Sequence, residues 1–146
     1  MNDRRRHATR GREVLSLLHA AWLAEAEIDR KLNSIGLSLP KLLALHALND
    51  AGESLPLGQL AERLSCVKSN ITQLVDRLEA DGYVARTPDP HDRRARLAVM
   101  TPKGRKAWNH GTSIREEAER EILTKLSTGE AQQLVALLEK VNVDPK

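Results

Sequence analysis

Hydrophobic residues recur every three or four positions along most of this chain, which is the spacing of one face of an α-helix. Leu57, Leu60, Ala61 and Leu64 follow this spacing, and it returns a few residues later from Ile71 onward. The pattern predicts helices over about 11–34, 39–51, 57–64, 68–80, 102–126 and 130–142. The two short helices at 57–64 and 68–80, joined by a tight turn, are typical of a helix-turn-helix.

Helix boundaries are indicated by residues that satisfy the backbone groups at helix ends. Ser38 and Thr101 each stand directly before the start of a predicted helix, where a hydroxyl can cap the first turn. Ser127 and Glu130 have the spacing of a capping box, and Gly82 is expected to end the helix over 68–80. The stretch 109–112, which contains glycine, predicts a kink or break in the helix that begins near 102.

Two short runs rich in β-formers follow the helix-turn-helix, over 83–87 and 97–100. Between them, residues 88–95 contain two prolines and two aspartates, which predicts a loop too long for a two-residue turn. A helix-turn-helix followed by a hairpin with arginines at its tip is a winged helix. The predicted fold is therefore mainly α with a small β-hairpin wing.

The positive charge is concentrated in two stretches of the chain. The whole chain has 23 Lys and Arg against 20 Asp and Glu, a net charge of +3. Residues 1–12 hold five arginines against one aspartate, and residues 63–105 hold nine basic residues against five acidic ones. The remainder is acidic, so the distribution favours a polyanionic partner such as nucleic acid.

Composition excludes several other classes of protein. A single cysteine excludes a disulfide framework and a cysteine-based zinc cluster within one chain. No apolar run approaches the ~20 residues of a membrane span, and no signal-type segment follows the basic start, so a cytoplasmic protein is expected. No catalytic motif, phosphate loop or paired metal ligands are found, so we expect no enzyme activity, cofactor or metal.

The order of these motifs resembles the MarR family of bacterial transcriptional regulators. The similarity covers about 11–142, and its motifs are 60–64, 70–79, 81–86, the wing segment 89–95 and the closing segment 101–104. The resemblance implies a homodimer that binds a pseudo-palindromic DNA operator, represses transcription and is released by a small-molecule effector. It also implies three parts: a mobile basic arm at 1–10, a helical dimerisation region at 11–36 and 102–146, and a winged helix-turn-helix at 37–101.

DNA-contacting residues are expected on the helix over 68–80 and in the wing. The polar face of that helix, opposite its apolar stripe, should enter the major groove, where amide and cationic side chains read base edges. Its predicted DNA-binding residues are Lys68, Ser69, Asn70, Thr72, Gln73 and Arg77. In the wing, Arg94 is expected in the minor groove, Arg93 and Arg96 near phosphates, and Asp89 or Asp92 in an ion pair that orients a guanidinium.

Four residues are candidates for an effector cleft, and two near the turn raise separate questions. The cleft candidates are His19, Trp22, His46 and Arg86, although Trp22 fits core packing better than the cleft. Cys66 is interpreted either as a small residue that fills the turn or as a thiol redox sensor. Val67 stands where the family usually has a Ser or Thr cap, so the start of the recognition helix is expected to shift. A winged-helix module that binds protein instead of DNA is the remaining alternative.

Overall fold

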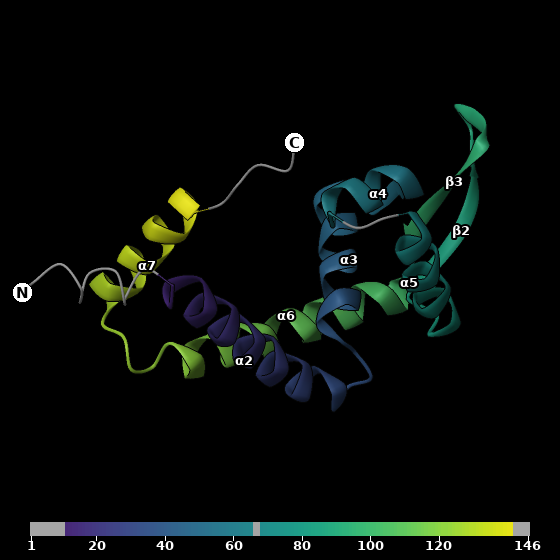
Figure 1. The fold of residues 1–146 in the computed structure, drawn as a ribbon. Coiled ribbons are helices and arrows are strands. Elements are labelled where there is room, and N and C mark those ends of the chain that lie inside the picture. Colours follow the sequence, from purple (N-terminus) through teal and green to yellow (C-terminus); the bar gives the residue numbers. More distant parts are fainter. Residues whose placement is uncertain (1–10, 66–67, 142–146) are drawn as a thin grey trace, which may run out of the picture.

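The computed structural model describes residues 11–65 and 68–141. The predicted basic arm at 1–10 therefore lies outside the described residues. Figure 1 shows long helices crossing the molecule, with a cluster of short helices and a small sheet at one end. The elements are α2 (Glu13–Asn33), α3 (Leu39–Asp50), β1 (Ser54–Pro56), α4 (Leu57–Arg63), α5 (Lys68–Ala80), β2 (Val84–Asp89), β3 (Asp92–Met100), α6 (Pro102–Ile122) and α7 (Thr128–Val141). The mainly helical fold with a winged helix is confirmed.

The hydrophobic core lies in the winged helix. Leu45 and Leu48 of α3 are fully buried against Leu60 of α4 and Val75 of α5. The apolar positions predicted for the two short helices are thus the ones that the core uses. This packing fixes α4 and α5 relative to each other, and so fixes which face of α5 remains at the surface.

The wing is longer and its turn tighter than the sequence pattern indicated. The three-stranded sheet has the order β1-β3-β2, and β1 is a strand that the sequence analysis did not predict. The predicted loop over 88–95 is wrong, because β2 and β3 continue through it and only Pro90 and His91 separate them. Pro88, which pairs with Arg96, is tolerated because β2 is an edge strand, where a missing N–H need not break a ladder.

Hydrogen bonds accepted by the two wing aspartates close the tip of the hairpin. Asp89 Oδ1 accepts the backbone N–H of His91 at 2.9 Å, and Asp92 Oδ1 accepts that of Arg94 at 2.9 Å. These are Asx turns, in which a carboxylate satisfies backbone donors two residues later. They allow the chain to reverse within two residues.

The predicted helix caps are confirmed. Ser38 accepts the N–H of Lys41, and Ser127 and Glu130 exchange side-chain hydrogen bonds with each other's backbone N–H at 3.2 and 2.8 Å. Gly82, with φ of +78°, ends α5 in the left-handed conformation that glycine adopts without strain. Local sequence rules were sufficient here because each cap depends on residues within one turn.

The predicted break in α6 is wrong, since the helix runs uninterrupted from Pro102 to Ile122. Gly111 is buried at its middle, and a Cβ there would lie 2.8 Å from a methyl of Leu37 and 2.9 Å from one of Leu42. The glycine therefore allows α6 to pack closely against α3 and against the segment that precedes α3. It does not interrupt α6.

Replacing Thr101 with alanine should lower the free energy of unfolding by about 1 kcal/mol. The Thr101 hydroxyl accepts the N–H of Gly104 at 3.0 Å and donates to the carbonyl of Gly82 at 2.6 Å, so it joins the start of α6 to the end of α5. Urea denaturation at a fixed protein concentration measures the change. Thr101→Ser, which keeps the hydroxyl, is the control and should remain near wild type; equal stability of the alanine variant would contradict the assigned cap.

The terminal helices α2 and α7 leave large apolar surfaces uncovered. None of the residues of α7, all of which are described, is buried, and α2 buries only Leu32. The large exposed apolar residues of these two helices are Val14, Leu15, Leu17, Leu18, Trp22, Leu23, Leu134, Val135, Leu137 and Val141. The prediction that Trp22 packs in the core is wrong for the single chain, because 64% of this residue is exposed.

Two helices of the predicted dimerisation region, α2 and α6, pack together within the chain. Lys31 Nζ lies 2.9 Å from Glu121 Oε2, and this hydrogen bond raises the pKa of Lys31 above its usual value. Figure 1 shows α7 at the end of the molecule opposite the wing. The apolar faces of α2 and α7 therefore lie far from the winged helix.

Candidate nucleic-acid interface

Helix α5 presents the polar face that the sequence analysis predicted. Ile71, Val75 and Leu78 are buried, while Asn70, Thr72, Gln73 and Arg77 on the other side are exposed. Lys68 and Ser69 belong to the first turn of the helix, and their side chains are outside the described part of the chain. The amphipathic period of α5 thus turns four of the six predicted side chains toward solvent.

The turn before α5 contains two residues on which the sequence analysis made separate predictions. Cys66 and Val67 lie outside the described residues, so both interpretations of Cys66 stay predictions. Helix α5 is described from Lys68 onward, directly after these two residues, so the expected shift of its start stays a prediction.

The three wing arginines all lie on β3 and are all exposed. They directly follow the tip of the hairpin, in the part of β3 that contains no buried residue: Arg93, Arg94 and Arg96. In the part of the chain that the structure describes, neither Asp89 nor Asp92 pairs with a guanidinium, and one oxygen of each carboxylate accepts a backbone N–H. The aspartates thus shape the tip, and the proposed ion pair with a wing arginine is not formed.

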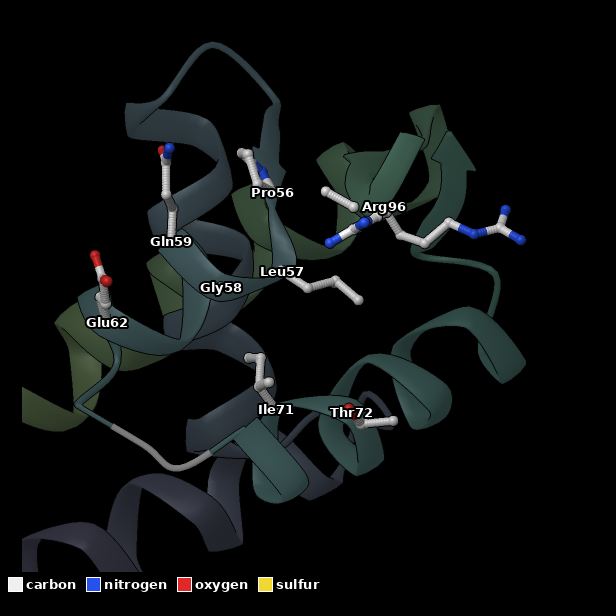
Figure 2. Close-up of a pocket in the computed structure, with 10 residues that line it drawn as sticks. Pro56, Leu57, Gly58, Gln59, Glu62, Ile71, Thr72 and Arg96 are labelled. Carbon is white, nitrogen blue, oxygen red and sulfur yellow. The ribbon is translucent and has the colours of Figure 1, made fainter. Parts of the chain in front are cut away.

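A groove of about 480 Å³ brings the wing next to the recognition helix. Figure 2 shows Gln59 and Glu62 on α4, Thr72 on α5 and Arg96 on the neighbouring strand around it. Its lining residues are Pro56, Leu57, Gly58, Gln59, Glu62, Ile71, Thr72, Arg94, Ala95 and Arg96. Three predicted DNA-binding residues, Thr72, Arg94 and Arg96, therefore share one concave surface.

Helix α4 contributes groove residues that the sequence analysis missed. Gln59 and Glu62 are exposed on α4 and line the groove opposite the wing. The position of α4 as the first helix of the helix-turn-helix, which crosses the backbone in such motifs, could have indicated them. Glu62 places a negative charge on the α4 side of the groove, so the cationic character of the groove comes from the arginines on the wing side.

The predicted effector residues are not gathered in one place. His46 on α3 lies 3.4 Å from Asp50 Oδ2, and its ring stacks on Trp108 of α6 with 6.5 Å between the ring centroids. It also lines a cavity of about 300 Å³ together with Leu43, Ala47, Asp50, Arg63, Leu64 and Ser65. His19 and Trp22 are exposed on α2, outside this lining.

Arg86 lies on β2 and faces α5 instead of the cavity beside His46. Its guanidinium is 2.6 Å from Asp76 Oδ1 and 3.3 Å from Glu79 Oε1. These partners were not predicted from the sequence, because they stand on α5 and Arg86 stands on β2. The signal that could have found them is the pair of acidic residues three apart on α5, since β2 folds back along this helix.

The described residues form neither a metal site nor a membrane span. Among residues 11–65 and 68–141, no three His, Cys, Asp or Glu side chains gather as a metal site requires. Within the same ranges, no helix is both long and apolar enough to cross a membrane.

These features define the class of winged helix-turn-helix proteins: a polar recognition helix, a β-hairpin wing with exposed arginines and a groove between them. A model of the MarR family matches residues 35–95, which contain most of this winged helix. This part of the chain is similar to the MarR family, and the relatives compared below are named as transcriptional regulators.

Three proteins illustrate the similarity. The transcriptional activatory protein BadR of Rhodopseudomonas palustris is 38% identical over 81 residues, which cover 54% of this chain and 46% of BadR. A probable transcriptional regulator from Pseudomonas aeruginosa is 27% identical with a TM-score of 0.82, covering 89% of this chain and 96% of that one. The MarR family regulator Sco3205 of Streptomyces coelicolor, solved in complex with DNA, is 25% identical with a TM-score of 0.83, covering 92% and 85%. The chain spans about half the length of the curated relatives that it matches first.

Proposed function

We propose that this protein is a dimeric, sequence-specific DNA-binding regulator of transcription. The observation that carries the proposal is the groove in which Thr72 of the recognition helix adjoins Arg94 and Arg96 of the wing. A helix of this kind fits the major groove, while a wing arginine reaches the adjacent minor groove. Both contacts are possible at once because α5 and β3 border the same concave surface.

The side chains available on α5 suit base recognition. Asn70 and Gln73 are exposed amides that can pair with adenine edges, and Arg77 can reach guanine or a phosphate. Thr72 and the wing arginines suit phosphates and the narrow minor groove. The regulator Sco3205, with which this chain shares its fold, was solved in complex with DNA, and this supports the same partner here.

A homodimer accounts for the exposed apolar faces of α2 and α7. Contiguous apolar surface of this extent is typical of an interaction site in a water-soluble protein. A two-fold symmetric pair would present two α5 helices about one DNA turn apart, ~34 Å, to a pseudo-palindromic operator. Binding to operator DNA would place this regulator in the cytoplasm.

We further propose repression that is released by a small effector. The cavity beside His46, with apolar walls from Leu43 and Leu64, a guanidinium from Arg63 and a carboxylate from Asp50, suits a small aromatic or aliphatic molecule with polar groups. A bound effector shifts the protein only if it binds the state with the wrong α5 spacing more tightly. Activation is the second candidate, because the relative BadR is described as an activatory protein; in vitro transcription from a template with the selected site determines the sign.

The test is a selection of duplexes from a random-sequence pool by the full chain. We expect an enriched inverted repeat whose half-sites are about 10 base pairs apart. Affinity for it should fall steeply and linearly on a plot of log K against log salt concentration, because phosphate contacts release counterions. Absence of any enriched sequence at low ionic strength would favour a protein-interaction module and overturn the proposal.

A further inference from the structure

Arg86 joins the wing to the recognition helix through four separate contacts, which we call the α5–wing clamp. Its guanidinium lies 2.6 Å from Asp76 Oδ1 and 3.3 Å from Glu79 Oε1, and donates to the carbonyl of Thr72 at 3.2 Å. The backbone N–H of Arg86 also donates to Glu79 Oε2 at 3.0 Å. The contacts span two turns of α5, so they restrain the direction of the helix relative to β2 as well as its distance.

The clamp is more than an ordinary surface ion pair. An exposed pair of this kind contributes under ~1 kcal/mol, but several charges in a network with charge-assisted hydrogen bonds hold one geometry much more firmly. The side chain of Arg86 is only 21% exposed, whereas those of Asp76 and Glu79 are 58% and 44% exposed. Arg86 is therefore the fixed centre, with the two carboxylates toward solvent.

Two exposed carboxylates on a DNA-binding helix are otherwise unfavourable. Asp76 and Glu79 would repel phosphates, and each lies on the helix that also carries Gln73 and Arg77. Pairing with Arg86 neutralises part of this negative charge and holds the two carboxylates against the wing strand β2. The same contacts hold the carbonyl of Thr72, a residue that lines the groove next to Arg94.

We propose that Arg86 is a positioning residue for DNA binding. It fixes the angle between α5 and the wing, so that the major-groove and minor-groove contacts are made together by one rigid unit. The proposal rests on the proposed function, and it assigns no DNA contact to Arg86 itself. Its distinguishing consequence is that removing a negative charge from α5 at Asp76 weakens binding, although electrostatics alone predict tighter binding.

The experiment uses the full chain and the inverted-repeat duplex that the wild-type protein selects, labelled with fluorescein. Arg86→Met should weaken binding about fivefold, ~1 kcal/mol, and Asp76→Asn about two- to threefold. The double variant should bind no more weakly than Arg86→Met, because both changes open the same clamp. Glu116→Gln is the matched control: it removes an exposed carboxylate from α6, outside both the groove and the clamp, so binding should be unchanged.

Hydrogen–deuterium exchange across the wing provides a second readout without DNA. Exchange over 84–100 should rise in both Arg86→Met and Asp76→Asn, and stay at the wild-type level in Glu116→Gln. Asp76 is largely exposed, so its asparagine variant keeps the test valid if Arg86→Met does not fold.

The opposite pattern would overturn the inference. If Asp76→Asn binds more tightly and Arg86→Met lowers the slope against log salt by about one, Arg86 contacts a phosphate directly. Unchanged exchange in the wing would show that the clamp does not hold it. Failure of the wild-type protein to select any duplex is a separate result that refutes the proposed function, while the exchange data still determine whether Arg86 fixes the wing.

Discussion

We expect Arg94→Ala to weaken binding to the selected duplex at least tenfold, ~1.4 kcal/mol. Arg94 is exposed on β3 near the tip of the wing and lines the groove beside Thr72. A guanidinium there can enter the minor groove, whose negative potential favours cations. Fluorescence anisotropy titration of the labelled duplex at a stated salt concentration measures the loss.

This result must be separated from a general loss of positive charge or of folded protein. Arg120→Ala removes an equally charged, exposed arginine from α6, away from the wing, and should leave the affinity near wild type. Thermal unfolding of Arg94→Ala should match wild type, because its side chain contributes nothing to the core. Unchanged DNA affinity in Arg94→Ala would remove the wing from the proposed interface.

Features that depend on near neighbours in sequence were predictable. The helix positions, the caps at Ser38 and Thr101 and the capping box at Ser127 all follow from periodicity and from side chains within one turn. The exposed face of α5 was predictable for the same reason, since the apolar stripe that packs in the core determines the polar face opposite. This is why much of the candidate interface could be found before the structure was known.

Features that depend on distant segments were not predictable. Strand β1 has only three residues and exists because β3 lies beside it, with Ser54 opposite Val99. The low helix propensity of glycine predicted a break in α6 at Gly111. The structure shows instead that glycine is needed there because α6 packs closely against Leu37 and Leu42. The spacing around Arg86 itself did not indicate its partners, because Asp76 and Glu79 stand on α5 and meet Arg86 only when β2 folds back along that helix.

In the wing, the local residue composition predicted a loop where the folded chain forms two strands. Prolines and aspartates over 88–95 are typical of a loop, and this composition predicted one. In the folded chain Asp89 and Asp92 instead tighten the reversal, and Pro88 is accommodated on an edge strand. The consequence for function is a longer, stiffer hairpin that carries its three arginines on one strand.

The largest effect is expected at the uncovered apolar face of α7. We predict that Leu137→Glu raises the dissociation constant of the homodimer at least a hundredfold, ~2.7 kcal/mol. Leu137 is 57% exposed in the single chain, and burial of such a side chain stabilises by about 1.5–3 kcal/mol. In a two-fold interface the loss occurs twice, and each new carboxylate must also be desolvated.

Sedimentation at micromolar concentration distinguishes the two oligomeric states, with Gln132→Glu as the matched control. Gln132 is exposed and, by helical spacing, lies on the side of α7 away from Leu134 and Leu138, so the same added charge should leave the dimer intact. The Leu137→Glu monomer should also bind the inverted repeat weakly, since a monomer holds only one half-site at a time. If wild type and Leu137→Glu both sediment as monomers, the apolar faces of α2 and α7 serve another partner and the two-half-site model of operator binding is wrong.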